Sequence, residues 1–290
     1  MPNSMVNPGR IFEELHGELA ASLAACRARP DRQAVHSLRT TARRLEALLR
    51  MMRQGHPRAV TLRHRVKKAL RPLKNLRRVA GPVRDMDVQR ALVATIAETL
   101  GHSESKRKRL EVECRQLDEH LRHRRKRLAA ALASSVRDSE QELEEAFEAV
   151  RGGVRRLPET SLLETARGLA VQSSTNLTDM NRESLHRYRK QTKAARYLAE
   201  MENKSAPAKR LATKIKGVLD AIGLWHDWML LAQEAKAAFG SGSMLTEAMK
   251  AERERALELA IHSVESFRGY SSRVGQSRML QVQLVSTIKA

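Results

Sequence analysis

The chain has 290 residues, with 54 Lys and Arg against 33 Asp and Glu, which gives a formal net charge of +21 at pH 7. A folded protein with this excess of cations is expected to bind a polyanion, such as nucleic acid, an anionic membrane surface or a phosphate polymer. No run reaches the ~18 consecutive apolar residues of a membrane span. The N-terminus also lacks the apolar stretch of a secretory signal, so we expect a cytoplasmic protein.

Aromatic residues make up 3% of the sequence, and the apolar residues are mostly Leu, Ala and Val. Together with abundant Arg and Glu this composition favours helices, and no alternating apolar run predicts a strand. The expected fold class is therefore all-α. Cys26 and Cys114 lie far apart without metal-ligand spacing, which predicts two reduced, semi-buried helix residues. We expect no metal site and no cofactor.

Apolar residues at helical spacing predict the helices of the first half. The first runs from about Arg10 to Ala28, and the second begins at the N-cap Asp31 and ends near Gln54. A third helix, rich in cations, is expected from about Arg58 to Val79, with a kink or a split at Pro72.

Gly81-Pro82 should then break the chain before a fourth helix, which has Asp85 in its first turn. After a turn at residues 101–104, a long charged helix is predicted over 104–133, with an interruption at Ser134-Ser135 before a segment that ends near residue 150. Two cation runs in this helical region are interpreted as solvated faces: Lys106–Leu110 and Arg122–Leu128.

The glycine pair and proline between residues 151 and 158 mark the favoured domain boundary. Five further helices are predicted after it, over about 159–173, 183–203, 207–222, 224–240 and 243–267. Gly223 should separate the third of these from the fourth, and residues 269–275 should be irregular.

A basic segment occurs twice in the chain. Val35–Arg50, VHSLRTTARRLEALLR, returns in altered form as LHRYRKQTKAARYLAE at Leu185–Glu200. The matching positions are His36, Arg39 and Arg43 in the first copy and His186, Arg189 and Lys193 in the second. At about 100° per residue these positions fall within an arc of roughly 60° beside an apolar face. Each copy is therefore predicted to form a helix that carries a row of cations headed by a histidine.

The residues that follow each basic helix repeat with the same spacing. The repeated set is Lys74, Gly81 and Asp85 in the first half and Lys216, Gly223 and Asp227 in the second. A tandem repeat of this kind predicts two similar four-helix bundles related by a pseudo-two-fold axis, residues 1–157 and 158–290. The two aspartates are interpreted as helix caps, or as side chains that hold a neighbouring Arg or His, rather than as catalytic carboxylates.

With these residues in hand, the chain resembles the CHAD family, the conserved-histidine α-helical domains. The matching pieces are VHSLRTTARRLEALL, GPVRDMDVQRAL, LHRYRKQTKAARYLAEM and IGLWHDWMLL, in the order of the family. The resemblance implies a two-bundle helical fold whose basic helices line a pore or groove that binds inorganic polyphosphate. It also implies association with polyphosphate granules.

Carried over residue by residue, the resemblance implies a polyphosphate-binding face made of cations from both repeats: His36, Arg39, Arg43, Arg44, Lys74, Arg84, His186, Arg189, Lys193, Arg196, Lys216 and His226. Ala194 stands where the first copy has Arg44, and His226 stands where it has Arg84. The second repeat is therefore expected to contact the ligand less evenly than the first.

Arg forks suit the oxygen acceptors of polyphosphate because they form charge-assisted and often bidentate hydrogen bonds. A polyanion nearby should also raise the protonated fraction of His36 and His186; the alternative is a neutral histidine at the edge of the core. No Walker-type loop, nucleophile–base pair or metal cluster stands out in the sequence, so we expect no catalysis. The alternative functions are a helical nucleic-acid-binding protein and an accessory regulator of a polyphosphate-metabolising enzyme. A homodimer is left open.

Overall fold

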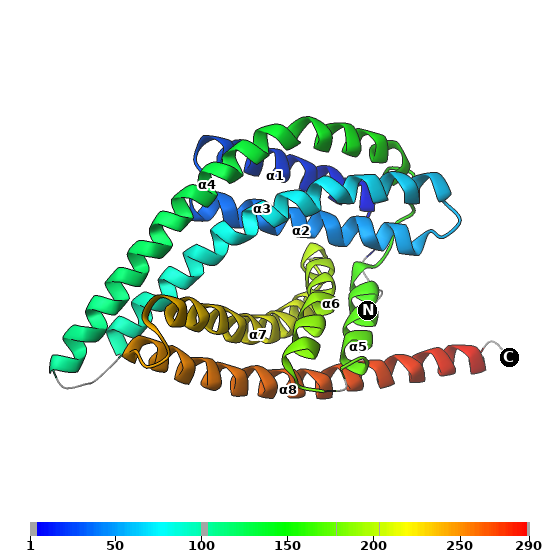
Figure 1. Cartoon of the computed structure of the whole chain (residues 1–290). Coiled ribbons are helices and arrows are strands. Elements are labelled where there is room, and N and C mark those ends of the chain that lie inside the picture. The colour runs from blue at the N-terminus through cyan, green and yellow to red at the C-terminus, as the bar shows by residue number, and fades with distance from the viewer. Residues whose placement is uncertain (1–4, 100–103, 178, 203, 289–290) are drawn as a thin grey trace. The chain divides into compact units, whose positions relative to one another are not determined.

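The computed structural model describes residues 5–99, 104–177, 179–202 and 204–288. These residues form eight α-helices (Figure 1): α1 (Pro8–Ala28), α2 (Arg32–Gly55), α3 (Val60–Thr99), α4 (Glu104–Val154), α5 (Leu162–Thr175), α6 (Arg182–Met201), α7 (Ala206–Phe239) and α8 (Met244–Ile288). Across the described ranges, β-structure consists of one isolated antiparallel bridge between Val6 and Thr160. The prediction of an all-α fold is confirmed. None of the helices in these ranges has both the length and the apolar character needed to cross a membrane.

Side-chain caps mark the starts of several helices. Asp31 Oδ1 accepts a hydrogen bond of 2.8 Å from the backbone N–H of Ala34, so the predicted cap of α2 is confirmed. Ser161 caps α5 and Asn181 caps α6 in the same way. Just after the C-terminal end of α7, Gly240 has a φ of +82°, a left-handed conformation that only glycine adopts without strain.

The predicted breaks at Gly81-Pro82 and at Gly223 are wrong. α3 runs without interruption through Pro72 and Gly81-Pro82, and α7 runs through Gly223. A proline inside a helix costs about 3 kcal/mol. α3 offsets this cost because it buries a row of apolar residues that includes Leu73 and Leu76, each of which contributes roughly 1.5–3 kcal/mol. Tertiary packing therefore overrides the local breaking signals.

Other predicted interruptions are also wrong. α4 continues through Ser134-Ser135, and α8 continues through residues 269–275. The serine pair does not interrupt α4 because Leu132 and Val136, on either side of it, are both fully buried. The turn predicted at residues 101–104 lies outside the described residues, apart from the glutamate that begins α4.

The chain divides into two compact units. The α2 unit comprises residues Gly9–Leu157 and Leu224–Ala256, and the α6 unit comprises Met1–Pro8, Pro158–Gly223 and Leu257–Ala290. α7 and α8 each contribute residues to both units. That the chain repeats as two similar bundles, residues 1–157 and 158–290, stays a prediction. The compact units divide the chain differently, because they group residues 224–256 with the first half.

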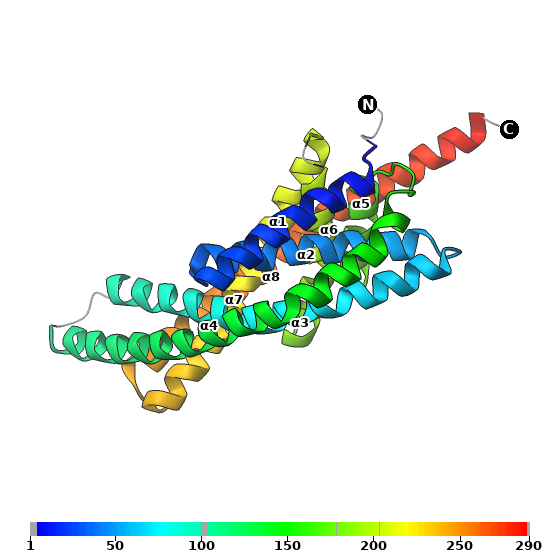
Figure 2. The same cartoon turned by 90° about the horizontal axis from the view of Figure 1, so that it is seen from above.

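In the α2 unit, α1 and α2 form one helical hairpin and α3 and α4 form another (Figures 1 and 2). α3 packs against both α2 and α4. The core between these helices contains Leu45, Leu49 and Leu76, together with Phe12 and Phe147, whose rings meet edge to face at 5.6 Å. This core supports the buried face of α2.

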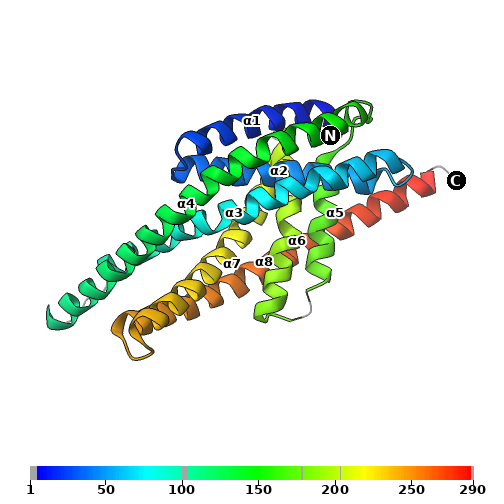
Figure 3. The same ribbon diagram turned by 45° about the horizontal axis from the view of Figure 1, so that its top comes forward.

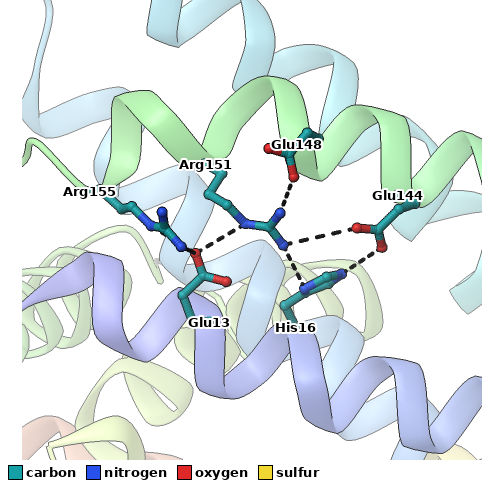
Figure 4. Close-up of polar contacts among 6 residues, drawn as sticks. All are labelled: Glu13, His16, Glu144, Glu148, Arg151 and Arg155. Atoms are coloured by element: carbon teal, nitrogen blue, oxygen red, sulfur yellow. Dashed lines mark hydrogen bonds and ion pairs between the residues drawn. The ribbon is translucent and has the colours of Figure 1, made fainter.

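A polar network joins α1 to α4 beside the aromatic pair (Figure 4). Arg151 Nε lies 3.1 Å from Glu13 Oε1, and Arg151 Nη2 lies 3.1 Å from His16 Nδ1. His16 Nε2 lies 2.9 Å from Glu144 Oε2, and Arg151 also contacts Glu148. The network fixes the register of α1 on α4.

In the α6 unit, α5 and α6 pack as a hairpin (Figure 3). The buried carboxylate of Glu202, just after α6, accepts a hydrogen bond of 2.8 Å from the backbone N–H of Leu163 at the start of α5. Leu185, Tyr188 and Ala195 of α6 are buried. These residues share one face of the helix, and residues 186, 189 and 193, which are partly exposed, lie beside that face.

Candidate functional site

The cationic row of α2 lies along the edge of its buried face. Leu38 and Leu45 are buried, whereas Arg39 and Arg43 are partly exposed and His36 is exposed. The guanidinium groups therefore lie between the core and the solvent. At such an edge a cation is partly desolvated but can still be reached by a ligand.

A glycine lies against the first arginine of each predicted row. A methyl group added at Gly81 of α3 would stand 3.0 Å from Arg39 Nη1. In the α6 unit, a methyl group added at Gly223 of α7 would stand 3.2 Å from Arg189 Nη2. Both separations are shorter than ordinary van der Waals contact. Each glycine thus allows a guanidinium group to approach the helix backbone closely, and it does not break the helix.

Four arginines gather in the α2 unit, Arg39 and three neighbours. The side chains that act electrostatically on Arg39 are those of Arg43, Arg84 and Arg77, with the carboxylate of Asp85 among them. We refer to these four arginines as the first cationic cluster. Burial, followed by the positive charge of Arg43, lowers the pKa of Arg39 to about 10, and Asp85 partly opposes this shift. Arg39 therefore remains charged at neutral pH, in surroundings that disfavour its charge.

Acidic side chains hold the outer members of the cluster in place. Arg84 Nη1 lies 3.4 Å from Asp85 Oδ1 and 3.3 Å from both carboxylate oxygens of Asp227. Arg77 Nε donates to Glu46 Oε1 at 2.8 Å. The interpretation of the two aspartates as holders of a neighbouring Arg is confirmed. Their interpretation as caps is wrong, because both lie inside continuous helices.

The other predicted residues of this unit differ in their surroundings. Arg43 Nε is buried with no hydrogen-bond partner in the described part of the chain, a donor that an anion could satisfy. Arg44 lies 3.7 Å from Glu18 in an ion pair, and Lys74 is exposed on α3. His226, next to Asp227 on α7, is partly exposed. His226 thus belongs to the α2 unit, as the cations of the first repeat do.

A second group of cations lies on α6. The positive groups that act on His186 are Lys190, Arg189, Lys193 and Arg182, and we refer to these five residues as the second cationic cluster. Burial and then these cations lower the pKa of His186 from its usual 6.5. His186 is therefore neutral near pH 7 unless additional negative charge approaches it.

Two predicted residues of the α6 unit are paired within their own helices. Arg196 Nε donates to Glu200 Oε1 at 2.6 Å, and its guanidinium lies over the ring of Tyr197 at 5.5 Å. Lys216 forms an ion pair with Asp220 one turn further along α7. Both cations are thus compensated locally.

Three of the gathered cations are absent from the predicted binding face. Arg77 stands one helical turn before Gly81, and Arg182 stands one turn before His186, so helical spacing could have found both. Lys190 lies four residues after His186 and is found by the same rule. The row of α6 is therefore wider than the matching positions alone indicate, and the first cationic cluster also includes Arg77 of α3.

Comparison with known proteins places the chain in a family. A family model described as the CHAD domain matches residues 10–236. Among solved structures, the crystal structure of the CHAD domain from the plant Ricinus communis is similar, with a TM-score of 0.62 and 16% sequence identity over 91% of this chain and 90% of that chain. At this identity the likeness shows a shared fold. No curated protein sequence matches the chain.

Proposed function

Because it matches the family model over most of its length, this chain belongs to the CHAD-domain family, and we propose on that premise that it binds inorganic polyphosphate without catalysing a reaction. The single observation that carries the proposal is the gathering of Arg39, Arg43, Arg77 and Arg84 around one partly buried position. The proposal applies to each cationic cluster by itself. The shared pore that the family resemblance implies stays a prediction.

The electrostatics of the first cationic cluster supply the physical reason. Burial and mutual repulsion disfavour the charge on Arg39, and the carboxylate of Asp85 compensates it only in part. A chain of phosphoryl groups carries negative charge at regular intervals and offers only oxygen acceptors. Guanidinium groups bind such oxygens with charge-assisted hydrogen bonds. A bound polyphosphate would therefore offset the repulsion and satisfy buried donors such as Arg43 Nε.

The second cationic cluster is expected to bind more weakly. It has Lys193 where the first repeat has an arginine, and Ala194 where the first repeat has Arg44. A lysine offers a point charge rather than a bidentate fork. Its histidine, His186, starts neutral and must take up a proton before it can act as a cation.

The test is a titration with long-chain polyphosphate and with duplex DNA of equal charge, each at several salt concentrations. We expect polyphosphate to bind more tightly at every salt concentration, with a log–log salt slope of about −0.7 per phosphate contact, by analogy with single strands. Replacing Arg39 and Arg43 together with Ala should flatten that slope and weaken binding. Tighter binding of DNA throughout would instead favour a nucleic-acid-binding function.

A matched control removes the same charge elsewhere in the α2 unit. Arg107 and Lys108 are exposed on α4, and each pairs with a glutamate of its own helix. The double substitution of these two residues with Ala should leave the salt slope unchanged. Equal losses in the two double variants would mean that net charge, not the first cationic cluster, determines binding.

Binding without catalysis and association with polyphosphate granules are tested separately. Incubation of the protein with polyphosphate should release no orthophosphate above the rate of a heat-inactivated sample, with and without Mg²⁺. A fluorescent fusion of the protein should co-localise with polyphosphate granules in cells, and the same fusion of the double variant of Arg39 and Arg43 should not. Release of orthophosphate that the same double variant abolishes would overturn the non-catalytic proposal.

A further inference from the structure

A cavity lies in the α2 unit, away from the predicted binding face. It has a volume of about 1170 Å³ and is formed by residues 27–32 of the α1–α2 turn, residues 87–94 of α3 and residues 111–133 of α4. Figures 1 and 2 show this turn beside the stretch where α3 and α4 run together. None of the twelve predicted polyphosphate-binding residues lines it. The volume is ample for a small organic ligand, for which pockets of roughly 300–1,000 Å³ are typical.

Two arginines of the cavity are held rigidly by carboxylates. Arg90 binds Asp118 with Nε and Nη2, at 2.7 and 3.1 Å. Arg125 donates from Nε to Asp87 at 2.7 Å and from Nη2 to the carbonyl oxygen of Pro30 at 2.9 Å. In both guanidinium groups Nη1 has no hydrogen bond to the described residues. The two groups are therefore positioned in advance as donors to an anion.

The remaining charges of the cavity also favour an anion. Eight Arg and Lys side chains line it against four Asp and Glu. Asp31 is engaged as the cap of α2, and Glu111 pairs with Arg107 at 3.5 Å. Exposed cations without an ion pair in the described chain, such as Arg115 and Lys126, stand at the rim. The charges of the lining that are not engaged within the protein, and that a ligand would meet, are therefore positive.

The wall between these cations is made of small apolar side chains. The alanines that line it are Ala91 and Ala94 of α3 and Ala129, Ala130 and Ala133 of α4. An inorganic anion gains nothing from methyl groups, whereas an organic ring placed on them gains about 25 cal/mol for each Å² of apolar surface removed from water. The combination of fixed guanidinium groups and a methyl-lined wall is typical of a site for an organic phosphate.

We propose that this cavity binds a nucleoside phosphate, with its phosphate groups on Arg90 and Arg125 and its base on the alanine wall. The neighbouring thiol of Cys114 takes no part in chemistry there, because burial raises its pKa to about 11 and keeps it protonated. The site is independent of the proposed polyphosphate-binding function. It also assigns a role to the basic run Arg122–Leu128, which the sequence alone indicates to be a solvated face.

The test compares ATP with inorganic tripolyphosphate by calorimetry on the full chain, at one fixed salt concentration. Ala130→Leu places a larger side chain on the wall. It should weaken ATP binding about tenfold, the effect of removing roughly 60 Å² of apolar contact, without changing tripolyphosphate binding. Ala131→Leu is the matched control, because Ala131 is exposed on the same helix and does not line the cavity. It should change neither affinity.

Two results would overturn the proposal. One is ATP binding that is absent, or no tighter than tripolyphosphate binding. The other is ATP binding that Ala130→Leu leaves intact. Long-chain polyphosphate should bind wild type and Ala130→Leu equally, so a failure here is distinguishable from a failure of the proposed polyphosphate-binding function. Circular dichroism of each variant checks that the helices persist.

Discussion

Replacing Gly81 with Ala should separate binding from stability in this protein. The new methyl group would stand 3.0 Å from Arg39 Nη1, so the guanidinium must shift by a few tenths of an ångström. A charge-assisted hydrogen bond contributes roughly 1.5–3 kcal/mol, and such a shift should cost part of that. With about 1 kcal/mol lost, polyphosphate binding should weaken roughly fivefold.

The stability of the same variant should not fall. An alanine inside a helix is favoured over glycine by about 0.8–1 kcal/mol, which offsets the cost of the displaced side chain. We therefore expect an unchanged or slightly higher Tm for Gly81→Ala in the absence of ligand. Gly223→Ala, whose methyl group would stand 3.2 Å from Arg189 Nη2, should behave in the same way with a smaller loss of affinity.

Two glycines provide matched controls. Gly17 in α1 and Gly217 in α7 are exposed, lie inside helices and have open space where a methyl group would stand. Alanine at either position should raise Tm by about 2 °C without changing polyphosphate affinity. The assay is a fluorescence titration at fixed salt, with Tm from thermal denaturation of the same samples. If Gly81→Ala binds as tightly as Gly17→Ala, the close approach of Arg39 to α3 has no role in binding.

Further predictions concern the charges around each cluster. Asp227→Asn leaves Arg84 without its buried counter-ion, so the ligand-free protein should lose about 1–3 kcal/mol of stability, and added polyphosphate should recover the Tm difference. Because the pKa of His186 is lowered, this side chain binds a proton less readily in the folded state than in the unfolded one, so the folded protein loses stability as pH drops below 6.5. NMR titration of His186 should show a pKa below 6.5 that rises when polyphosphate binds. An unchanged pKa would rule out contact between His186 and the ligand. Arg151→Ala should lower the free energy of unfolding by about 1–3 kcal/mol, whereas Arg155→Ala should change it little. The reason is that the Arg151 side chain is 19% exposed in the network of Figure 4, whereas that of Arg155 is 64% exposed. Equal Tm values for the two variants would contradict this prediction.

Much of the fold and of the candidate site could be predicted from the sequence. Composition alone indicates an all-α protein, because abundant Leu, Ala, Arg and Glu favour helices wherever they occur. The repeated spacing of His36, Arg39 and Arg43 identifies the basic face of α2, since helical periodicity relates residues three and four positions apart. The cap at Asp31 follows from a similarly local interaction.

The continuity of α3 and α7 was decided only by the tertiary structure. Gly81-Pro82 and Gly223 carry strong local signals for a break, yet both lie inside helices whose apolar faces are buried. The free energy of that burial depends on distant residues of other helices, so no local pattern contains it. The same limit applies to Arg84 and Asp227, which are 143 residues apart and meet through folding. Local spacing therefore determined which residues carry charge on one face, and long-range packing determined which of those charges lie together.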